Sequence, residues 1–217
     1  MINNITSIPT VILAGGKSQR LLLNNQRKWQ LDFGGQSLLD VVIHRLRQQT
    51  NTIIINGQAA DSADLSATGL PLIYDESAQG NVSLNNVKGP IAGLIAAISW
   101  AKAKGHPWVA TVPCDTPFFP DNLLATLSLQ VNKHKTRAAI AQSKTQRHAV
   151  FGLWSIELFD QLISAVTHDN IRAIRKWAAL CACTVNFPYI QRGDNTIDPF
   201  FNINTPKDYR QALHYLK

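Results

Sequence analysis

The chain of 217 residues is 45% hydrophobic and 16% charged, which favours one folded domain over a disordered chain. Its net charge of +7 fits either a solvated basic surface or an anionic partner, and scattered basic residues without a recognisable nucleic-acid-binding motif argue against DNA or RNA. A secretory leader, an apolar run of roughly 18 residues and an even set of cysteines are missing, so we expect a cytoplasmic protein without membrane partners.

Segments typical of strands alternate with segments typical of helices along the chain. The expected strands are Thr10–Leu13, Thr52–Asn56, Leu72–Tyr74, Trp108–Val112, Ala138–Ala141 and Val150–Trp154. The expected helices are Ser37–Gln49, Pro90–Lys104, Asp121–Gln130 and one that begins near Thr205. Several strands are continuous β-branched runs, as in parallel sheets buried on both faces. We therefore predict one α/β domain over residues 1–217, a three-layer Rossmann-like sandwich with a mostly parallel sheet, and a mobile loop at Gly80–Lys88.

The first strand runs into a glycine pair and a lysine, in the sequence VILAGGKSQR. This stretch is not a P-loop, because that motif requires a glycine where this chain has Val11, inside the strand. The dinucleotide fingerprint also fails, since Gly15 and Gly16 are adjacent. A glycine pair still lets backbone N–H groups approach phosphate oxygens closely.

Basic residues follow the glycine pair and are suited to clamping a triphosphate: Lys17, Arg20, Arg27 and Lys28. A tight turn with a solvated basic loop accounts for the same residues equally well. The stretch alone leaves both interpretations open.

A second polar group follows the strand WVATV, in the sequence PCDTP at residues 113–117. Ligands of open α/β sheets bind outside the carboxyl ends of the strands, where this segment is expected. Asp115 there suits Mg²⁺ held by one or two carboxylates and by phosphates, although a turn aspartate is also common. Asn56 and Asp75 end two further strands, which favours a shared site.

Four segments together resemble the MobA-like nucleotidyltransferases over nearly the whole chain: LAGGKSQR, KGPIAGL at 88–94, PCDTP, and DPFFNINTP at 198–206. RHAVFGLW at 147–154 also matches, with Ala149 where proline is typical. The resemblance implies a nucleotide-diphospho-sugar transferase-like fold. It also implies transfer of GMP from GTP to molybdenum-bearing molybdopterin, release of pyrophosphate, and Mg²⁺ as cofactor. Proteins of molybdenum cofactor biosynthesis and molybdoenzyme chaperones are further implied partners.

The resemblance also implies roles for individual residues. Catalysis would rest on Lys28 and Asp115, and Asp115 would bind the metal. The implied nucleotide-binding residues are Leu13, Ala14, Gly15, Gly16, Lys17, Arg20, Lys28, Asn56, Asp75 and Asp115. The implied pterin-binding residues are Arg172, Asn202 and Asn204.

The chain departs from the family pattern in the basic segment. Leu21 and Leu22 follow Arg20 where the family has Met-Gly, and Arg27 stands where an aspartate usually precedes the lysine. Three alternatives therefore stay open: an enzyme of the same family that uses CTP, one that acts on a sugar phosphate, and a non-catalytic protein that binds GTP or molybdopterin.

Overall fold

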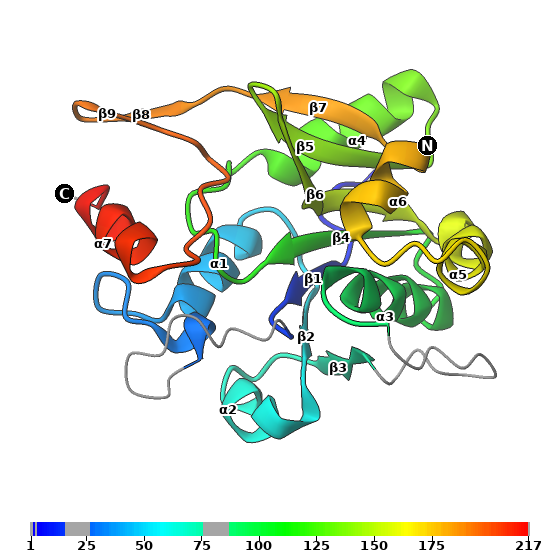
Figure 1. The fold of residues 1–217 in the computed structure, drawn as a ribbon, viewed down its shortest axis with the longest axis horizontal. Coiled ribbons are helices and arrows are strands. Elements are labelled where there is room, and N and C mark those ends of the chain that lie inside the picture. Colours follow the sequence, from blue (N-terminus) through cyan, green and yellow to red (C-terminus); the bar gives the residue numbers. More distant parts are fainter. Residues whose placement is uncertain (1, 3, 16–26, 76–86, 217) are drawn as a thin grey trace.

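The computed structural model describes residue 2 and residues 4–15, 27–75 and 87–216, in which a seven-stranded sheet lies between two layers of helices (Figure 1). The strands are β1 (Thr10–Leu13), β2 (Ile53–Gly57), β3 (Leu72–Tyr74), β4 (Trp108–Pro113), β5 (Ala138–Ser143), β6 (Gln146–Ser155) and β7 (Cys183–Phe187). Their order is β3-β2-β1-β4-β6-β5-β7, and β6 alone among these seven runs against the others. The predicted mostly parallel sandwich is therefore confirmed.

Helices cover both faces of the sheet, and the side chains of one strand alternate between the two faces. Ile12 of β1 packs into one apolar cluster, whereas Val11 and Leu13 pack into a second cluster on the opposite face. The first cluster takes residues from α1 (Leu38–Arg47), α2 (Ser62–Ser66) and α4 (Leu123–His134). The second takes residues from α3 (Pro90–Ala103), α5 (Phe159–Thr167) and α6 (Ile174–Cys181).

All six expected strands are present, and four expected helices form. The helix predicted to begin near Thr205 is α7 (Pro206–His214). It has a capping box, in which the Asp208 N–H donates to the Thr205 hydroxyl oxygen. Sequence patterns did not indicate β7, α2, α5, α6 or the hairpin of β8 (Ile190–Arg192) and β9 (Asn195–Ile197). Most of the loop predicted at Gly80–Lys88 lies outside the described residues.

A third apolar cluster lies beside the sheet and includes Leu31, Phe118, Ile203 and Ala212 of α7. Three of these residues come from chain segments that are far apart in sequence. Leu31 follows Lys28, Phe118 follows Asp115, and Ile203 precedes Asn204, so their packing brings three predicted site segments together. None of the helices in the described ranges is long and apolar enough to cross a bilayer.

Candidate active site

The carboxyl ends of four parallel strands form the edge of the sheet at which predicted site residues meet. Leu13 at the end of β1 pairs with Asn56 of β2 on one side and with Pro113 of β4 on the other. Gly15 therefore follows β1, Asp75 follows β3, and Asp115 follows β4, all at this edge. The strand order changes direction at β1 and β4, which is the position where open α/β sheets bind ligands.

Lys28 joins two other segments at this edge. Its Nζ lies 2.5 Å from Asp115 Oδ2 and donates to Asn204 Oδ1 at 2.7 Å. The side chains of Lys28 and Asp115 are only 8% and 14% exposed, so the ion pair is largely shielded from water. The ammonium is held by one charged and one neutral acceptor, which compensates its burial. The structure thus brings the two residues predicted to be catalytic into contact with one predicted to bind the pterin, and those roles stay predictions.

The predicted nucleotide residues near β1 and β2 also lie together. Asn56 is buried, and its Nδ2 donates to Asp75 Oδ1 at 3.1 Å. Gln58, which the sequence did not single out, donates from Nε2 to the Gly15 carbonyl at 2.8 Å. These contacts place carboxylate and amide groups beside the chain where it leaves β1.

Gly93 explains part of the KGPIAGL segment at the start of α3. A Cβ at this position would lie 2.7 Å from Asn56 Oδ1 and 3.0 Å from Leu13 Cδ2. The glycine therefore makes room for Leu13, the last residue of β1, and for Asn56 near the end of β2. Gly89, with a φ of 74°, adopts a backbone conformation that favours glycine, and Pro90 then begins the helix.

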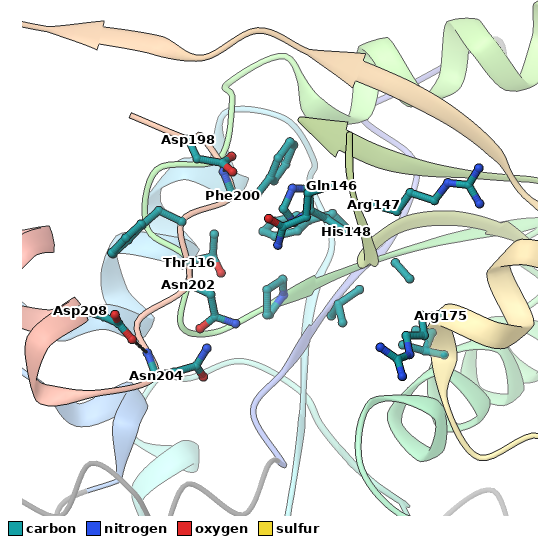
Figure 2. Close-up of a pocket in the computed structure, with 16 residues that line it drawn as sticks. Thr116, Gln146, Arg147, His148, Arg175, Asp198, Phe200, Asn202, Asn204 and Asp208 are labelled. Carbon is teal, nitrogen blue, oxygen red and sulfur yellow. Dashed lines mark hydrogen bonds between the residues drawn. The ribbon is translucent and has the colours of Figure 1, made fainter. Parts of the chain in front are cut away.

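A cavity of about 530 Å³ adjoins the Lys28 cluster (Figure 2). The amino end of antiparallel β6 forms one wall, and the segment before α7 forms another. The polar lining residues include Gln146, Arg147, His148, Arg175, Asp198, Asn202 and Asn204. Asn204 thus belongs to both regions, because its side chain also accepts from Lys28. Asn202 and Asn204 line the cavity, and their role in pterin binding stays a prediction.

Two arginines of α6 and its preceding segment differ in placement. The predicted Arg172 donates from Nη1 to the Val166 carbonyl of α5 at 2.6 Å and does not line this cavity. Arg175, at the second position of α6, lines it instead. No pattern in the sequence distinguished Arg175 from the other basic residues.

A chain of hydrogen bonds fixes His148 at the cavity wall. The Ser143 hydroxyl donates to Asp198 Oδ2 at 2.9 Å and lies 2.7 Å from His148 Nε2. Because the hydroxyl proton is directed to the carboxylate, the Nε2 proton of His148 donates to the hydroxyl oxygen. Burial lowers the pKa of His148, and the nearby Asp198 charge opposes that shift. The imidazole is therefore favoured in its neutral form.

The thiol next to Asp115 is not an activated nucleophile. Burial, followed by the Asp115 charge, raises the pKa of Cys114 far above its ordinary value. The thiolate is the reactive form of cysteine, so this thiol stays unreactive in the folded protein. The charged groups that act on this thiol are Asp115 and Lys28, which form the ion pair described above.

Asp115 is the residue predicted to bind a metal at this edge. Within the described ranges, three or more acidic, histidine or cysteine side chains nowhere gather as a metal-binding group. Asp115 Oδ1 has a long contact of 3.4 Å with the Thr116 hydroxyl, whereas Oδ2 contacts Lys28. One carboxylate completed by phosphate oxygens and water is a common donor set for Mg²⁺. Gly16, Lys17 and Arg20, also predicted to bind the nucleotide, lie outside the described residues.

Comparisons with known proteins show similarity over nearly the whole chain. The chain is 39% identical over 217 residues to the molybdenum cofactor guanylyltransferase of Rhizobium meliloti strain 1021, covering 99% of this chain and 94% of the relative. It is 36% identical over 213 residues to that of Sinorhizobium fredii, covering 96% and 91%.

A solved structure extends the likeness to the fold. The crystal structure of molybdopterin-guanine dinucleotide biosynthesis protein A from Archaeoglobus fulgidus is 21% identical, with a TM-score of 0.71, and the match covers 96% of this chain and 98% of that one. The family model for the MobA-like NTP transferase domain matches residues 10–182, from β1 to the residue before β7. The chain belongs to the MobA-like NTP transferases, a family of nucleotidyltransferases.

Proposed function

We propose that this protein transfers GMP from GTP to the terminal phosphate of molybdenum-bearing molybdopterin and releases pyrophosphate. The observation that carries the proposal is the contact of Lys28 with both Asp115 and Asn204. Asp115 follows β4 at the edge expected to bind the nucleotide, and Asn204 lines the adjoining cavity. The lysine therefore lies between a triphosphate site and a second substrate site, where the two reacting groups must meet.

The cavity suits an anionic heterocyclic acceptor. Arg147 and Arg175 line it, and the Arg175 side chain matches a phosphate group, which arginine binds through two parallel hydrogen bonds. Asn202, Gln146 and neutral His148 offer donors and acceptors for the edge of a pterin ring. Phe200 packs its ring 4.6 Å from that of His148 and gives the wall an apolar surface.

The reaction needs positioning and charge neutralisation more than proton transfer. A phosphate oxygen of molybdopterin, already anionic at neutral pH, forms a bond to the α-phosphorus of GTP while the bond from that phosphorus to the bridging oxygen of pyrophosphate breaks. Lys28 stabilises the negative charge that develops on the phosphate oxygens, and Asn204 orients its ammonium. Asn56 and Asp75 line the nucleotide side of this edge.

Asp115 is the residue that we propose to hold Mg²⁺ together with the phosphates. Its carboxylate lies at the strand end, and oxygen ligands are those that Mg²⁺ prefers. When bound, Mg²⁺ neutralises charge on the phosphate oxygens. Lys28 contacts the same carboxylate and provides a second positive charge beside it.

The decisive experiment measures pyrophosphate release and the dinucleotide product with molybdenum-loaded molybdopterin and GTP, CTP or ATP. We expect turnover with GTP. Turnover with CTP alone would move the activity to a cytidylyltransferase of the same family, and GTP binding without turnover would favour a non-catalytic carrier. Turnover with a sugar phosphate instead of molybdopterin would overturn the assignment of the acceptor.

Two variants and their controls test the residues. Lys28→Met and Asp115→Asn should lower kcat/KM by about 100-fold or more, because each removes charge needed in the transition state. Lys102 and Asp160 form another lysine–aspartate pair, 3.7 Å apart and exposed on α3 and α5, so Lys102→Met and Asp160→Asn are matched controls. Near-normal turnover by a folded Lys28→Met or Asp115→Asn variant would remove that residue from the mechanism.

A further inference from the structure

The residue before the catalytic lysine is part of a shielded ion pair. Arg27 Nε lies 2.7 Å from Asp61 Oδ1. The Asp61 side chain is 8% exposed and that of Arg27 is 36% exposed. A carboxylate buried to this degree requires a compensating charge, so the guanidinium is directed to Asp61.

A second contact ties the same turn to the same neighbouring segment. Lys28–Gln30 form a short 3-10 turn, and Gln30 Oε1 accepts from the Arg27 backbone N–H at 2.9 Å. Gln30 Nε2 donates to Asp64 Oδ2 of α2 at 3.1 Å. Both ends of the turn therefore bind the chain that follows β2, at residues 61 and 64. Trp29 is buried in the core cluster beneath the turn.

From these contacts we propose that Arg27 and Asp61 are positioning residues that hold the Lys28 ammonium at Asp115 and Asn204. The proposal rests on the proposed transfer of GMP. It differs from the expectation that Arg27 clamps a phosphate, because the charge of Arg27 is compensated by Asp61. Lys28 is the intermediary: the ion pair fixes the turn, and the turn fixes the direction of the lysine side chain.

The two roles of Arg27 predict opposite effects of Asp61→Asn. If Arg27 positions Lys28, loss of the Asp61 charge loosens the turn, and kcat falls about 10-fold while KM for GTP changes little, since small displacements of catalytic groups are costly. If Arg27 clamps phosphate, the freed guanidinium strengthens GTP binding and lowers KM without a loss of kcat, and the proposal is overturned. Asp121→Asn is the matched control, because Asp121 pairs with Arg45 at 2.6 Å outside the site.

Substitution of Arg27 supplies the second half of the test. Arg27→Ala should lower kcat to a similar extent, and Arg27→Lys should restore much of it because the charge is retained. The double variant Arg27→Ala with Asp61→Asn should be no slower than the slower single variant, since both substitutions break one interaction. Additive losses would contradict a shared role of the pair.

A readout without turnover separates this proposal from the proposed function. The Lys28 ammonium is shielded, so an amine-reactive acetylating reagent should modify it slowly in protein without added nucleotide. Mass spectrometry measures the extent of acetylation. Asp61→Asn and Arg27→Ala should speed acetylation of Lys28 about 10-fold, relative to exposed Lys102 in the same sample. Unchanged acetylation would overturn the positioning role even if the wild type is active. An inactive wild type with faster acetylation of Lys28 in both variants would instead overturn only the transfer of GMP.

Discussion

Gly93→Ala tests whether the nucleotide edge depends on close packing between α3 and the ends of β1 and β2. The new Cβ would lie 2.7 Å from Asn56 Oδ1, closer than such contacts allow, and 3.0 Å from Leu13 Cδ2. Asn56 is 2% exposed, so its side chain has little room to move without breaking its hydrogen bond with Asp75. The substitution therefore disturbs two predicted nucleotide-binding residues without altering either.

Two opposing effects set the change that Gly93→Ala makes in the free energy of unfolding. Alanine in a helix interior is favoured over glycine by about 1 kcal/mol, so an unobstructed site would be stabilised. Displacing Asn56 breaks a hydrogen bond to a carboxylate, which costs about 1.5 to 3 kcal/mol and leaves polar atoms poorly paired. We expect a net loss of about 1 to 2 kcal/mol in the free energy of unfolding, with strain at Leu13 adding to it.

Urea unfolding and the KM for GTP are the measurements. Ser99→Ala, farther along α3 and partly exposed, is the control for helix propensity: it should raise the free energy of unfolding by up to about 0.5 kcal/mol and leave the KM for GTP unchanged. Adding Asn56→Ala to Gly93→Ala should recover part of the stability lost through the clash, because the amide oxygen is removed. A Gly93→Ala protein that is more stable than the wild type, with an unchanged KM for GTP, would refute the packing argument.

Two further predictions concern titratable groups. Because burial lowers the pKa of His148 below its ordinary 6.5, its neutral form contributes stability that is present above that pH and is lost as the pH falls through 6.5 toward the lower folded value. His148→Gln should therefore flatten the fall in unfolding free energy between about pH 7.5 and about pH 5.5, and an unchanged slope would argue against it. Burial raises the pKa of Cys114 strongly, so iodoacetamide should leave it unmodified in native protein and label it after unfolding. Rapid native labelling at Cys114 would show that the end of β4 opens readily.

The sequence predicted the parts of the fold that have strong local patterns. Continuous apolar runs marked β1, β2 and β4, and the Thr205 cap marked α7, because these signals depend on neighbouring residues. Strand β7 was missed because it lies at the sheet edge and exposes alternate residues, including Thr184. Its pairing with β5 is set by tertiary contact, which a local pattern does not record.

The candidate site, too, contains residues that a local motif predicted and residues that only the fold brings into contact. Asp115 and Asn204 stood out because each belongs to a short motif beside a strand or helix end. Gln58, Asp61 and Arg175 did not, because their roles arise from contacts with residues distant in the sequence. The glycine at position 93 was visible within a motif, yet its reason, the space for Asn56, required the fold.

The three segments that meet at Lys28 are fixed in different ways. The Ile203 backbone N–H donates to the Asp115 carbonyl at 3.0 Å, so the segments of Asp115 and Asn204 are joined through the main chain. The backbone hydrogen bonds around Lys28 in the described chain remain local, from Arg27 to Leu38. Besides the apolar cluster that Leu31 shares with Phe118 and Ile203, the Lys28 ammonium links this segment to Asp115 and Asn204, which are 87 and 176 residues away in sequence. Arg27 and Gln30 tie its turn to Asp61 and Asp64. Substitutions at Asp61 or Asp64 should therefore shift the lysine before they disturb the other two segments.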